Sequence, residues 1–405
     1  MKKIMIWGTG KYASYIFESI SIDKCIFEGF VDNNIEKKNK LWKNKYKIYS
    51  LEKSVELDVD YYIISAMYSK EQITLQAKEL NIANKLIWYW KDELDKYDFI
   101  NNSSYLKENI LLKIKIEKLQ RQVENAPYEY GKSIVKIKSS KDLLKKIIDN
   151  NCSLCRFGDG EFDIILKQNR AWFQKYDSNM AKKLELILKS QDEKILIAIA
   201  DNYGNLDKYT DRAADAIRQY MTVEKRKKHM KLLDLSREYY DAYVSRPYII
   251  YKDKNKNASE IFKLYKNMFY KRNILIIEGK NTKTGVGNSL LDGVKSVRRI
   301  LCPDFNAYNS YEVILKTTIS YALKDDLILI TLGPTATILA YDLALKGYQA
   351  IDFGQVDNEY EWFLRNATER VIIEGKSVSE LSWYRIPILQ MQDVEYEKQI
   401  IANIE

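Results

Sequence analysis

The sequence predicts an α/β protein with two parallel-sheet domains of the Rossmann type, joined by a helical linker, and three observations indicate this. Short apolar runs typical of buried strands alternate with helical patterns, both early and late in the chain. At 405 residues, the chain is long for a single domain. Between its halves lies a charged segment in which Leu and Ile recur at helical spacing. We therefore expect domains at residues 1–98 and 132–405, with the linker at 99–131.

The composition favours folded cores and an anionic ligand over nucleic acid. Apolar residues make up 46% of the chain, and 65 Lys and Arg against 56 Asp and Glu give a net charge of +9. This mild excess suits an anionic small substrate or an acidic membrane surface, and no repeat of a nucleic-acid module is present. The chain starts with a strand pattern instead of a signal peptide, and no apolar run reaches transmembrane length. We expect a soluble, cytoplasmic protein without a nucleic-acid partner, for which peripheral membrane contact stays open.

Cysteine and histidine are too scarce for several kinds of site. Cys152 and Cys155 form a C-x-x-C pair, but no second pair or neighbouring His completes a zinc site. We expect core thiols, with a redox or metal role as the alternative. His229 is the single His and follows four Lys and Arg residues, which predicts a solvated basic helix face. Catalysis by a Ser-His-Asp triad is therefore disfavoured, and any general base has to be a carboxylate.

The first domain carries a glycine-rich turn directly after its first strand. Its strand patterns lie at 4–7, 30–32 and 61–66. Gly8, Gly10 and Ala13 fit the dinucleotide fingerprint, and a helical pattern follows to Ile20. Asp32 stands at the distance expected of the acid that binds the ribose. Cofactor binding through Gly8, Gly10 and Asp32 is one hypothesis, and a docking or structural role is the other.

The linker begins after a break at 101–104, and Pro127 is expected to end it. A helix is predicted from Leu106 to Val123, because Leu and Ile recur there at helical spacing among charged residues. The same spacing would suit a dimerisation seam, although it is short for one, so a homo-oligomer stays open.

In the second domain, several predicted strands end in polar or glycine-rich residues. A helix is expected at 141–149, before the strand that carries Arg156. Further strand patterns lie at 195–200, 244–249, 274–277, 297–301, 326–332 and 350–352, the last clear one. In open parallel sheets, ligands bind at the carboxyl ends of the strands, where helices begin. We expect the functional site at that edge.

The most informative stretch is Arg156-Phe157-Gly158-Asp159-Gly160-Glu161. On an extended segment, alternate residues point the same way, so Asp159 and Glu161 can converge on one Mg²⁺ or Mn²⁺ ion. The two glycines let an anionic ligand approach the backbone. Asp163 continues the alternation as a further ligand or a supporting group. The alternative is a solvated acidic turn after a strand.

Two glycine-containing turns predict contacts to phosphate. Residues 333–337 combine close backbone approach, hydroxyl groups and a helix N-terminus. Residues 280–288 form a glycine-rich loop with two lysines. The basic side chains able to neutralise a diphosphate are Arg156, Arg246, Lys280 and Lys283. The alternatives are a capped turn, a surface loop and ordinary surface salt bridges.

The segment 352–362 brings carboxylates and aromatic side chains together. This combination suits an acceptor sugar, held by hydroxyl contacts and by stacking. Asp357 and Glu359 would be the catalytic carboxylates that assist the attack of its hydroxyl. The alternative is an acidic helix start, which the helix dipole favours in any case.

Taken in order, these segments resemble the bacterial glycosyltransferase family with the GT-D fold, over about residues 134–375. The motifs are Arg-Phe-Gly-Asp-Gly-Glu, Ser-Arg-Pro, Glu-Gly-(x)-Gly-Val-Gly-Asn, Gly-Pro-Thr-Ala-Thr and Asp-(x)-Gly-(x)-(x)-Asp-(x)-Glu-Tyr-Glu-Trp. The resemblance implies a GT-D type C-terminal domain and metal-dependent transfer from a nucleotide sugar, in polysaccharide or glycoprotein synthesis. The N-terminal part is similar to small Rossmann-like domains found beside sugar-modifying enzymes.

Residue by residue, the resemblance assigns Asp159 and Glu161 to the family's Asp-Xaa-Glu metal motif. It places Arg156 and Asp201 beside the nucleotide sugar. It assigns substrate binding also to Gly285, Gly287, Asn288, Gly333, Pro334 and Thr335. Ser289 and Gln355 depart from the pattern, because the family usually has Asp and His there. These departures bear on rate or acceptor choice and leave the metal motif intact.

The expected function is a hexosyltransferase that moves a hexose from UDP-glucose or a similar UDP-sugar to a glycan acceptor. Mn²⁺ or Mg²⁺, held by Asp159 and Glu161, would bridge the diphosphate and stabilise the departing nucleotide. One rival is an NAD(P)-dependent sugar-modifying oxidoreductase that uses the fingerprint at Gly8. The other is a non-catalytic nucleotide-sugar-binding protein, which the two departures make conceivable.

Overall fold

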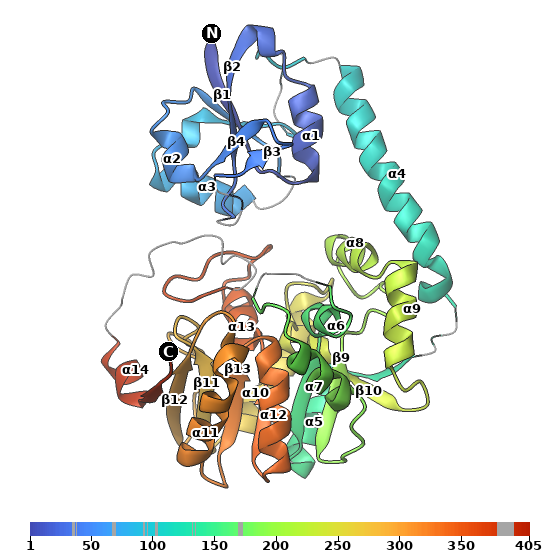
Figure 1. Ribbon diagram of the computed structural model, residues 1–405, viewed down its shortest axis with the longest axis vertical. Coiled ribbons are helices and arrows are strands. Elements are labelled where there is room, and N and C mark those ends of the chain that lie inside the picture. Colours follow the sequence, from blue (N-terminus) through green and yellow to red (C-terminus); the bar gives the residue numbers. More distant parts are fainter. Residues whose placement is uncertain are drawn as a thin grey trace. The chain divides into compact units, whose positions relative to one another are not determined.

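The computed structural model consists of two compact α/β units, made mainly of Met1–Leu119 and of Gln120–Thr368 (Figure 1). It describes the chain apart from residues 35, 36, 38, 67–69, 92, 93, 95, 102, 103, 132, 134, 169–172 and 379–392. The division between the units falls within one long helix, α4 (Ser104–Glu129). In the described part of the chain, no helix has the length and apolar character needed to cross a bilayer.

The described strands of the first unit form a six-stranded sheet in the order β3-β4-β2-β1-β5-β6. All neighbours pair in parallel except β3 and β4. The strands are β1 (Lys2–Trp7), β2 (Cys25–Val31), β3 (Leu41–Trp42), β4 (Tyr46–Tyr49), β5 (Tyr61–Ile64) and β6 (Leu86–Trp88). The helices are α1 (Lys11–Glu18), α2 (Leu51–Val55) and α3 (Lys70–Glu79). Ile4 and Ile6 face one apolar cluster, and Met5 and Trp7 face another, as the period of a strand requires.

The described strands of the second unit form a nine-stranded sheet in the order β15-β12-β11-β13-β14-β8-β9-β10-β7, with parallel pairing throughout. The strands are β7 (Lys136–Lys138), β8 (Ser153–Phe157), β9 (Ile195–Ile199), β10 (Glu238–Asp241), β11 (Asn273–Gly279), β12 (Ser296–Cys302), β13 (Leu327–Thr331), β14 (Gln349–Asp352) and β15 (Ile400–Asn403). The helices are α5 (Ser140–Asn150), α6 (Asp159–Ile165), α7 (Ser178–Leu188), α8 (Asp211–Tyr220), α9 (Val223–Leu232), α10 (Lys254–Phe269), α11 (Tyr311–Tyr321), α12 (Pro334–Leu345), α13 (Val356–Leu364) and α14 (Val394–Gln399).

Helices cover both faces of this sheet, so its central strands, such as β9 and β13, are apolar along most of their length. Leu275 and Ile277 of β11 lie in one cluster with the buried residues of α7 and α12. The intervening Ile274 and Ile276 are also buried and point to the opposite face, where α5 and α10 pack against each other. The alternation of strands and helices confirms the predicted α/β class.

Three strand predictions in the second unit were wrong or incomplete. The apolar run at 244–249 begins as a short 3₁₀ turn, Ala242–Ser245, and the strand precedes it as β10. The run is apolar because it is buried beneath α10, where Tyr265 Oη donates to the Val244 carbonyl at 3.3 Å. β7 and β15 were missed because edge strands are short and carry little apolar pattern.

Pro127 does not end the linker helix, because α4 continues through it to Glu129. Proline keeps a helical φ and removes only one backbone donor, which the last turn tolerates better than a helix centre. A buried ion pair holds the helix end, since the Arg218 Nε and Nη2 each donate to the Glu129 carboxylate at 2.7 Å.

A second buried ion pair joins β11 to β12. Glu278 is fully buried and Arg299 is nearly so, and Arg299 Nη1 donates to Glu278 Oε1 at 2.5 Å. The other Glu278 oxygen accepts from the Thr284 amide at 2.7 Å, and Arg299 Nη2 donates to the Thr284 carbonyl at 2.8 Å. The pair therefore also fixes the start of the glycine loop.

We predict that Glu278→Gln destabilises the second unit strongly, because it leaves the buried Arg299 charge without its partner. The expected loss is about 3–5 kcal/mol in the free energy of unfolding. Urea unfolding followed by circular dichroism measures it. Glu185→Gln, which removes an exposed ion pair with Lys189, should change the curve little. Equal curves for the two variants would contradict the role of the buried pair.

Candidate active site

The Asp159–Glu161 motif lies in the first turn of a helix, and the prediction of an extended segment was wrong. β8 ends at Phe157, Gly158 is the N-cap, and α6 begins at Asp159. Residues two apart on a helix point to nearly opposite sides, so alternation along a strand cannot bring the two carboxylates together. Glu161 instead turns back and accepts from the Gly158 amide at 2.7 Å, while Asp159 is exposed. Carboxylates are favourable in a first turn, because the amides there lack helical partners.

Burial raises the pKa of Glu161 to about 7, and the negative charge of Asp352 adds to the effect. The Gly158 amide and the positive charge of Arg156 act in the opposite direction. A cation beside this carboxylate would favour its charged form. A divalent ion and the Glu161 charge would therefore stabilise each other.

Arg156 clamps neighbouring strand ends together. Its Nε donates to the Asp352 carbonyl at 2.7 Å, its Nη2 to Asp352 Oδ1 at 2.5 Å, and its Nη1 to Ser245 Oγ at 2.7 Å. Gly354 has φ +58, and a Cβ at this position would collide with the guanidinium. Three of the five N–H donors of Arg156 are thus used inside the protein. These contacts indicate a positioning role, and direct binding of a diphosphate by Arg156 stays a prediction.

Charged residues from three neighbouring strands converge near the hydroxyl of Tyr243. Asp159 follows β8, Asp201 follows β9, and Asp241 ends β10. Burial raises the pKa of Tyr243, and these three negative charges raise it further. The positive charge of Arg246 lowers it. Because β8, β9 and β10 are neighbours in the sheet, the predicted residues Asp159, Asp201 and Arg246 that follow them lie in one region of its carboxyl edge.

Sequence reasoning missed Asp241 and Tyr243, because it placed the strand after them. Asp241 is buried and accepts from Ser140 Oγ at 2.9 Å and from the Tyr243 amide at 2.8 Å. Burial and the charge of Asp201 raise the pKa of Asp241 to about 6. The sequence signal that could have identified Asp241 was a strand pattern that ends in Asp, as at Asp201. Asp201 itself forms an ion pair with Lys208.

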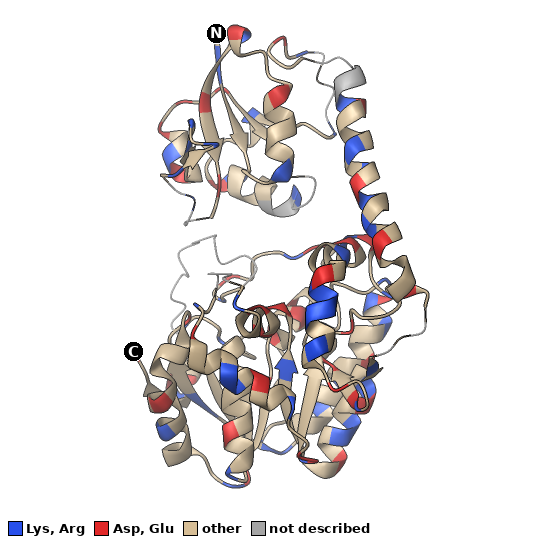
Figure 2. Cartoon of the chain, turned by 45° about the vertical axis from the view of Figure 1, so that its right-hand side comes forward, with Lys and Arg blue, Asp and Glu red and all other residues tan. Residues whose placement is uncertain are grey.

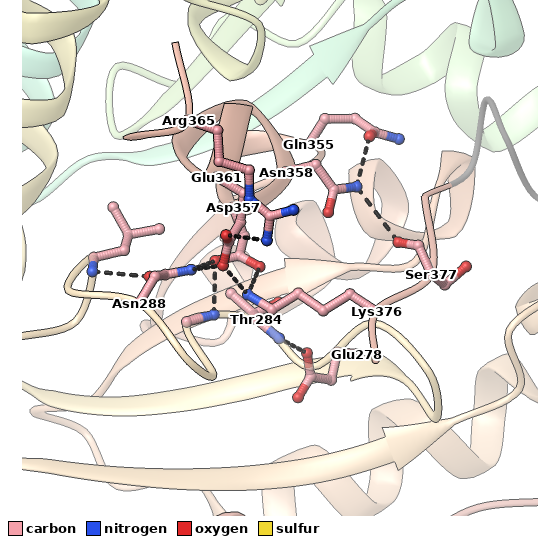
Figure 3. Close-up of polar contacts among 12 residues, drawn as sticks. Glu278, Thr284, Asn288, Gln355, Asp357, Asn358, Glu361, Arg365, Lys376 and Ser377 are labelled. Atoms are coloured by element: carbon pink, nitrogen blue, oxygen red, sulfur yellow. Dashed lines mark hydrogen bonds and ion pairs between the residues drawn. The ribbon is translucent and has the colours of Figure 1, made fainter. Parts of the chain in front are cut away.

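The glycine loop is held to α13 by two carboxylates (Figure 3). Asp357 Oδ1 accepts from the Gly285 amide at 2.9 Å and from Asn288 Nδ2 at 2.8 Å. Its Oδ2 accepts from Lys376 Nζ at 2.7 Å. Glu361 Oε1 accepts from the same Asn288 and Lys376 groups at 2.8 and 3.1 Å. The predicted loop and the predicted acidic segment are therefore one assembly.

Both carboxylates predicted as catalytic hold loops in place. Glu359 is fully buried, and its Oε2 accepts from the amides of Tyr248 and Ile249 at 2.9 Å each. Asp357 binds the glycine loop as described. A role of either as the general base stays a prediction. Lys280 and Lys283 of the glycine loop are both partly exposed. The Lys283 ammonium lies 5.7 Å from the centre of the Tyr396 ring.

The turn after β13 lies next to the start of α6. Gly333 has φ +55, and a Cβ there would clash with the ring of Phe173. Pro334 occupies the first helical position of α12, where its missing amide costs nothing. A Cβ on Gly160 would lie 3.6 Å from Pro334 Cγ. The N-termini of α6 and α12 are therefore neighbours, which favours an anion between them, and the buried Thr335 follows in the same turn.

The two positions that depart from the family pattern have side-chain contacts of their own. Ser289 Oγ lies 2.7 Å from Tyr360 Oη, and Gln355 Oε1 accepts from Asn358 Nδ2 at 3.1 Å. Gln355 is the N-cap of α13. Both residues therefore belong to the assembly that holds the glycine loop.

His229 is buried, and the prediction of a solvated basic face was wrong for it. Its ring stacks on Phe162 of α6 with centroids 4.1 Å apart, and its Nδ1 lies 2.9 Å from Tyr203 Oη. Burial lowers the pKa of His229 to about 3, with the charges of Lys225 and Arg226 adding to the effect. His229 and Arg226 are three residues apart on α9, so both lie on its inner face.

In the first unit, the predicted ribose-binding residue Asp32 already has hydrogen-bond partners in its own domain. Asp32 Oδ2 accepts from the Thr9 amide at 3.0 Å and from Lys37 Nζ at 3.1 Å. Gly8 has φ +107, and Gly10 precedes α1 with open space around it. A ribose would have to compete with these bonds of Asp32. Cofactor binding through Gly8, Gly10 and Asp32 stays a prediction.

A divalent ion fits the second unit as part of a complex with a diphosphate. In the described part of the chain, no three His, Cys, Asp or Glu side chains are placed to hold a metal by themselves. Nucleotide-bound Mg²⁺ usually takes only one or two carboxylates, with phosphate oxygens and waters as its other ligands. Asp159 is exposed, and the Gly158 amide engages Oε2 of Glu161. A carboxylate has two acceptor oxygens, so both residues have the oxygen chemistry that such an ion takes. Joint binding of one ion by Asp159 and Glu161 stays a prediction.

Fold and site define an α/β protein in which charged side chains and two helix N-termini lie at the carboxyl edge of a parallel sheet. Residues 154–381 match the family model described as "Glycosyltransferase GT-D fold". The chain belongs to this glycosyltransferase family, which confirms the predicted family and its fold. Residues 1–88 match a model described as "C2185-like, N-terminal".

Curated and solved relatives agree with the family. The chain is 34% identical over 282 residues to "Probable glycosyl transferase Gly" of Streptococcus gordonii, covering 69% of this chain and 40% of that protein. It is 31% identical over 293 residues to "Glycosyltransferase GlyD" of Streptococcus pneumoniae serotype 4 (strain ATCC BAA-334 / TIGR4), covering 71% and 34%. The chain thus spans less than half the length of these two relatives. A solved structure described as "The highly conserved domain of unknown function 1792 has a distinct glycosyltransferase fold" matches with a TM-score of 0.64 and 36% identity, over 67% of this chain and 97% of that one.

We predict that Asp241 makes the protein less stable as the pH rises. The pKa of its carboxyl is higher in the folded state than the unfolded value of 3.8, so the folded state binds more protons between these values. Raising the pH from about 4 to 7 should therefore cost about 2 kcal/mol of unfolding free energy through this group. Asp241→Asn should remove that part of the slope in urea unfolding at several pH values.

Asp149→Asn, at an exposed position of α5, is the matched control and should keep the wild-type slope. An Asp241→Asn variant with an unchanged slope would contradict the raised pKa of Asp241.

Proposed function

We propose that this chain is a cytoplasmic, metal-dependent hexosyltransferase that moves a hexose from UDP-glucose or a similar UDP-sugar to a glycan acceptor, in the synthesis of surface polysaccharide or glycoprotein. Membership of the GT-D family supplies the class of reaction. The observation that carries the rest is the adjacency of β8, β9 and β10, which places Asp159, Asp201 and Arg246 at one edge of the sheet. Carboxylates and a guanidinium at one sheet edge suit a sugar diphosphate with its counter-ion.

The diphosphate is proposed to lie at the adjacent N-termini of α6 and α12. Amides at a helix N-terminus favour an anion, and the two helix starts adjoin at Gly160 and Pro334. Asp159 and Glu161 would hold Mn²⁺ or Mg²⁺ there, and this ion would offset the negative charge that develops on the leaving nucleotide. Arg246, Lys280 and Lys283 would share that task from the neighbouring segments.

The glycine loop is proposed to shape the donor pocket. Asp357 and Glu361 fix Gly285 and Asn288 from α13, while Glu359 fixes the segment that follows Arg246. Such carboxylates hold binding groups in place before the substrate arrives, which lowers the cost of ordering them in the complex. Asp357 and Glu359 remain the candidates for assisting the acceptor hydroxyl.

Asp159→Asn should reduce UDP release in the presence of Mn²⁺, a panel of UDP-sugars and glycan acceptors. We expect a loss of about 100-fold or more in kcat/KM, because metal stabilisation of a leaving group contributes several kcal/mol. Asp211→Asn is the matched control, since Asp211 is likewise exposed at the first position of a helix, α8.

Equal activity of the two Asn variants would contradict the role of Asp159. Tight binding of a UDP-sugar without turnover, across many acceptors, would instead support the non-catalytic alternative.

Lys280→Ala should raise the KM for the UDP-sugar about 10-fold with a smaller change in kcat, because it removes a charge near the diphosphate but leaves Asp159 in place. Initial rates over a range of donor concentrations measure this. Lys263→Ala removes an exposed charge on α10 and should leave both constants near those of the wild type. A matching rise in KM for both variants would mean that only overall charge matters.

A further inference from the structure

The helix α4 uses one face for contacts with its own chain. Ile110 is buried, and the Glu117 carboxylate pairs with Lys11. Farther along, both guanidinium contacts of Arg121 reach Asp215 at 2.9 Å. Asn125 and Glu129 continue the series, as the partners of Arg226 and Arg218. Steps of seven and four residues keep these positions on one side of the helix.

The opposite face of α4 carries an exposed apolar stripe. It consists of Leu112, Ile116, Leu119 and Val123, with exposed fractions of 50%, 52%, 49% and 72%. The spacing of four, three and four residues is the a/d spacing of a coiled coil. Single exposed apolar residues are common, but a continuous apolar stripe marks an interaction surface. Figure 2 shows that this helix also carries charged residues of both signs between its uncharged positions.

The residue types of the stripe favour two parallel helices. Ile116 and Val123 occupy a positions, and Leu112 and Leu119 occupy d positions. β-branched residues at a with Leu at d select a two-stranded parallel coiled coil. One heptad before Ile116, the a position holds Asn109. A single Asn at an a position fixes the register, because its amide finds its best partner in the same Asn of the other helix.

The flanking residues give the same orientation. Glu108 occupies a g position and Lys113 the e position of the next heptad, so in a parallel pair each Glu108 meets the partner's Lys113. Lys113 also lies 6.0 Å from the centre of the Tyr15 ring in its own chain, at the outer limit of such a contact. In an antiparallel pair that keeps the a/d seam, Asn109 would face Ala126 and lose its amide partner.

From these observations we infer that α4 pairs with α4 of a second copy of this chain, as a parallel and in-register two-stranded coiled coil. The helix is already formed and anchored by its inner face, so pairing does not have to nucleate it. Along the sequence, α4 lies between the two matched regions, residues 1–88 and 154–381. The inference is independent of the proposed transfer reaction.

Sedimentation equilibrium of the full chain tests the pairing. The wild type should be a dimer, and the double variant Ile116→Glu, Leu119→Glu should be a monomer at the same concentrations, because charges at a and d cannot be buried. Val313→Glu is the matched control, at a 55% exposed position on α11, and should stay dimeric. A monomeric wild type, or a dimer that survives the double variant, would overturn the inference.

A disulfide tests orientation and register. The four native Cys are all buried, so a cysteine introduced by Val123→Cys is the exposed thiol. At an a position it faces its own copy in a parallel, in-register pair, and mild oxidation should give a covalent dimer on a non-reducing gel. Val313→Cys, the matched control, should give little covalent dimer. A wild-type dimer in which Val123→Cys does not cross-link would overturn the parallel register.

Asn109→Val tests the pairing in the opposite direction, because this variant should associate more strongly than the wild type. An apolar a position should strengthen pairing and relax its restriction to two strands, which gives more dimer at low concentration or larger assemblies. Weaker association of this variant would contradict the place of Asn109 in the seam. Recruitment of monomeric protein to anionic vesicles, abolished by the Glu double variant, would show that the stripe binds membrane and would overturn the inference.

Discussion

The site depends on one constraint, the parallel pairing of every described neighbour in the nine-stranded sheet. Parallel strands end at the same edge, and each is followed by a turn and often a helix whose amides point toward that edge. Residues that are far apart in sequence, such as Asp159, Asp201 and Asp241, therefore lie at one edge of the sheet. The parallel sheet brings these residues to one edge. The buried Glu278–Arg299 pair and the contacts of Arg156 hold neighbouring strands in register.

The acidic residues of this edge divide into two groups by burial. Asp352, Asp357 and Glu359 are buried, and each accepts hydrogen bonds from amides or cationic side chains. A buried carboxylate needs such donors, because it has lost its water. Asp159 is exposed, and the Asp201 side chain is 26% exposed, so these two can meet a ligand. The buried carboxylates thus hold the loops in place, and the exposed ones stay the predicted contacts to the ligand.

The sequence was sufficient for the class of fold, because strand and helix periods are local properties. The order of the motifs along the chain also indicated the family. The glycine loop and the acidic segment were found as separate sequence signals. It could not show that Glu161 caps a helix, since a short Gly-Asp-Gly-Glu stretch suits a turn, a strand or a helix start equally well. It placed His229 outside because its neighbours are basic, whereas packing on Phe162 decides its position. Asp357 and Glu359 were predicted as catalytic because burial and partners, which show their work on the loops, are not visible in sequence.

The location of the bound nucleotide tests the account most directly. A crystal structure of the chain with UDP and Mn²⁺, with the metal located by anomalous scattering, would show it. The account predicts that the manganese lies beside Asp159, with the diphosphate between the starts of α6 and α12. A diphosphate bound at the Gly8 turn of the first unit, or a manganese ion without contact to Asp159, would contradict it.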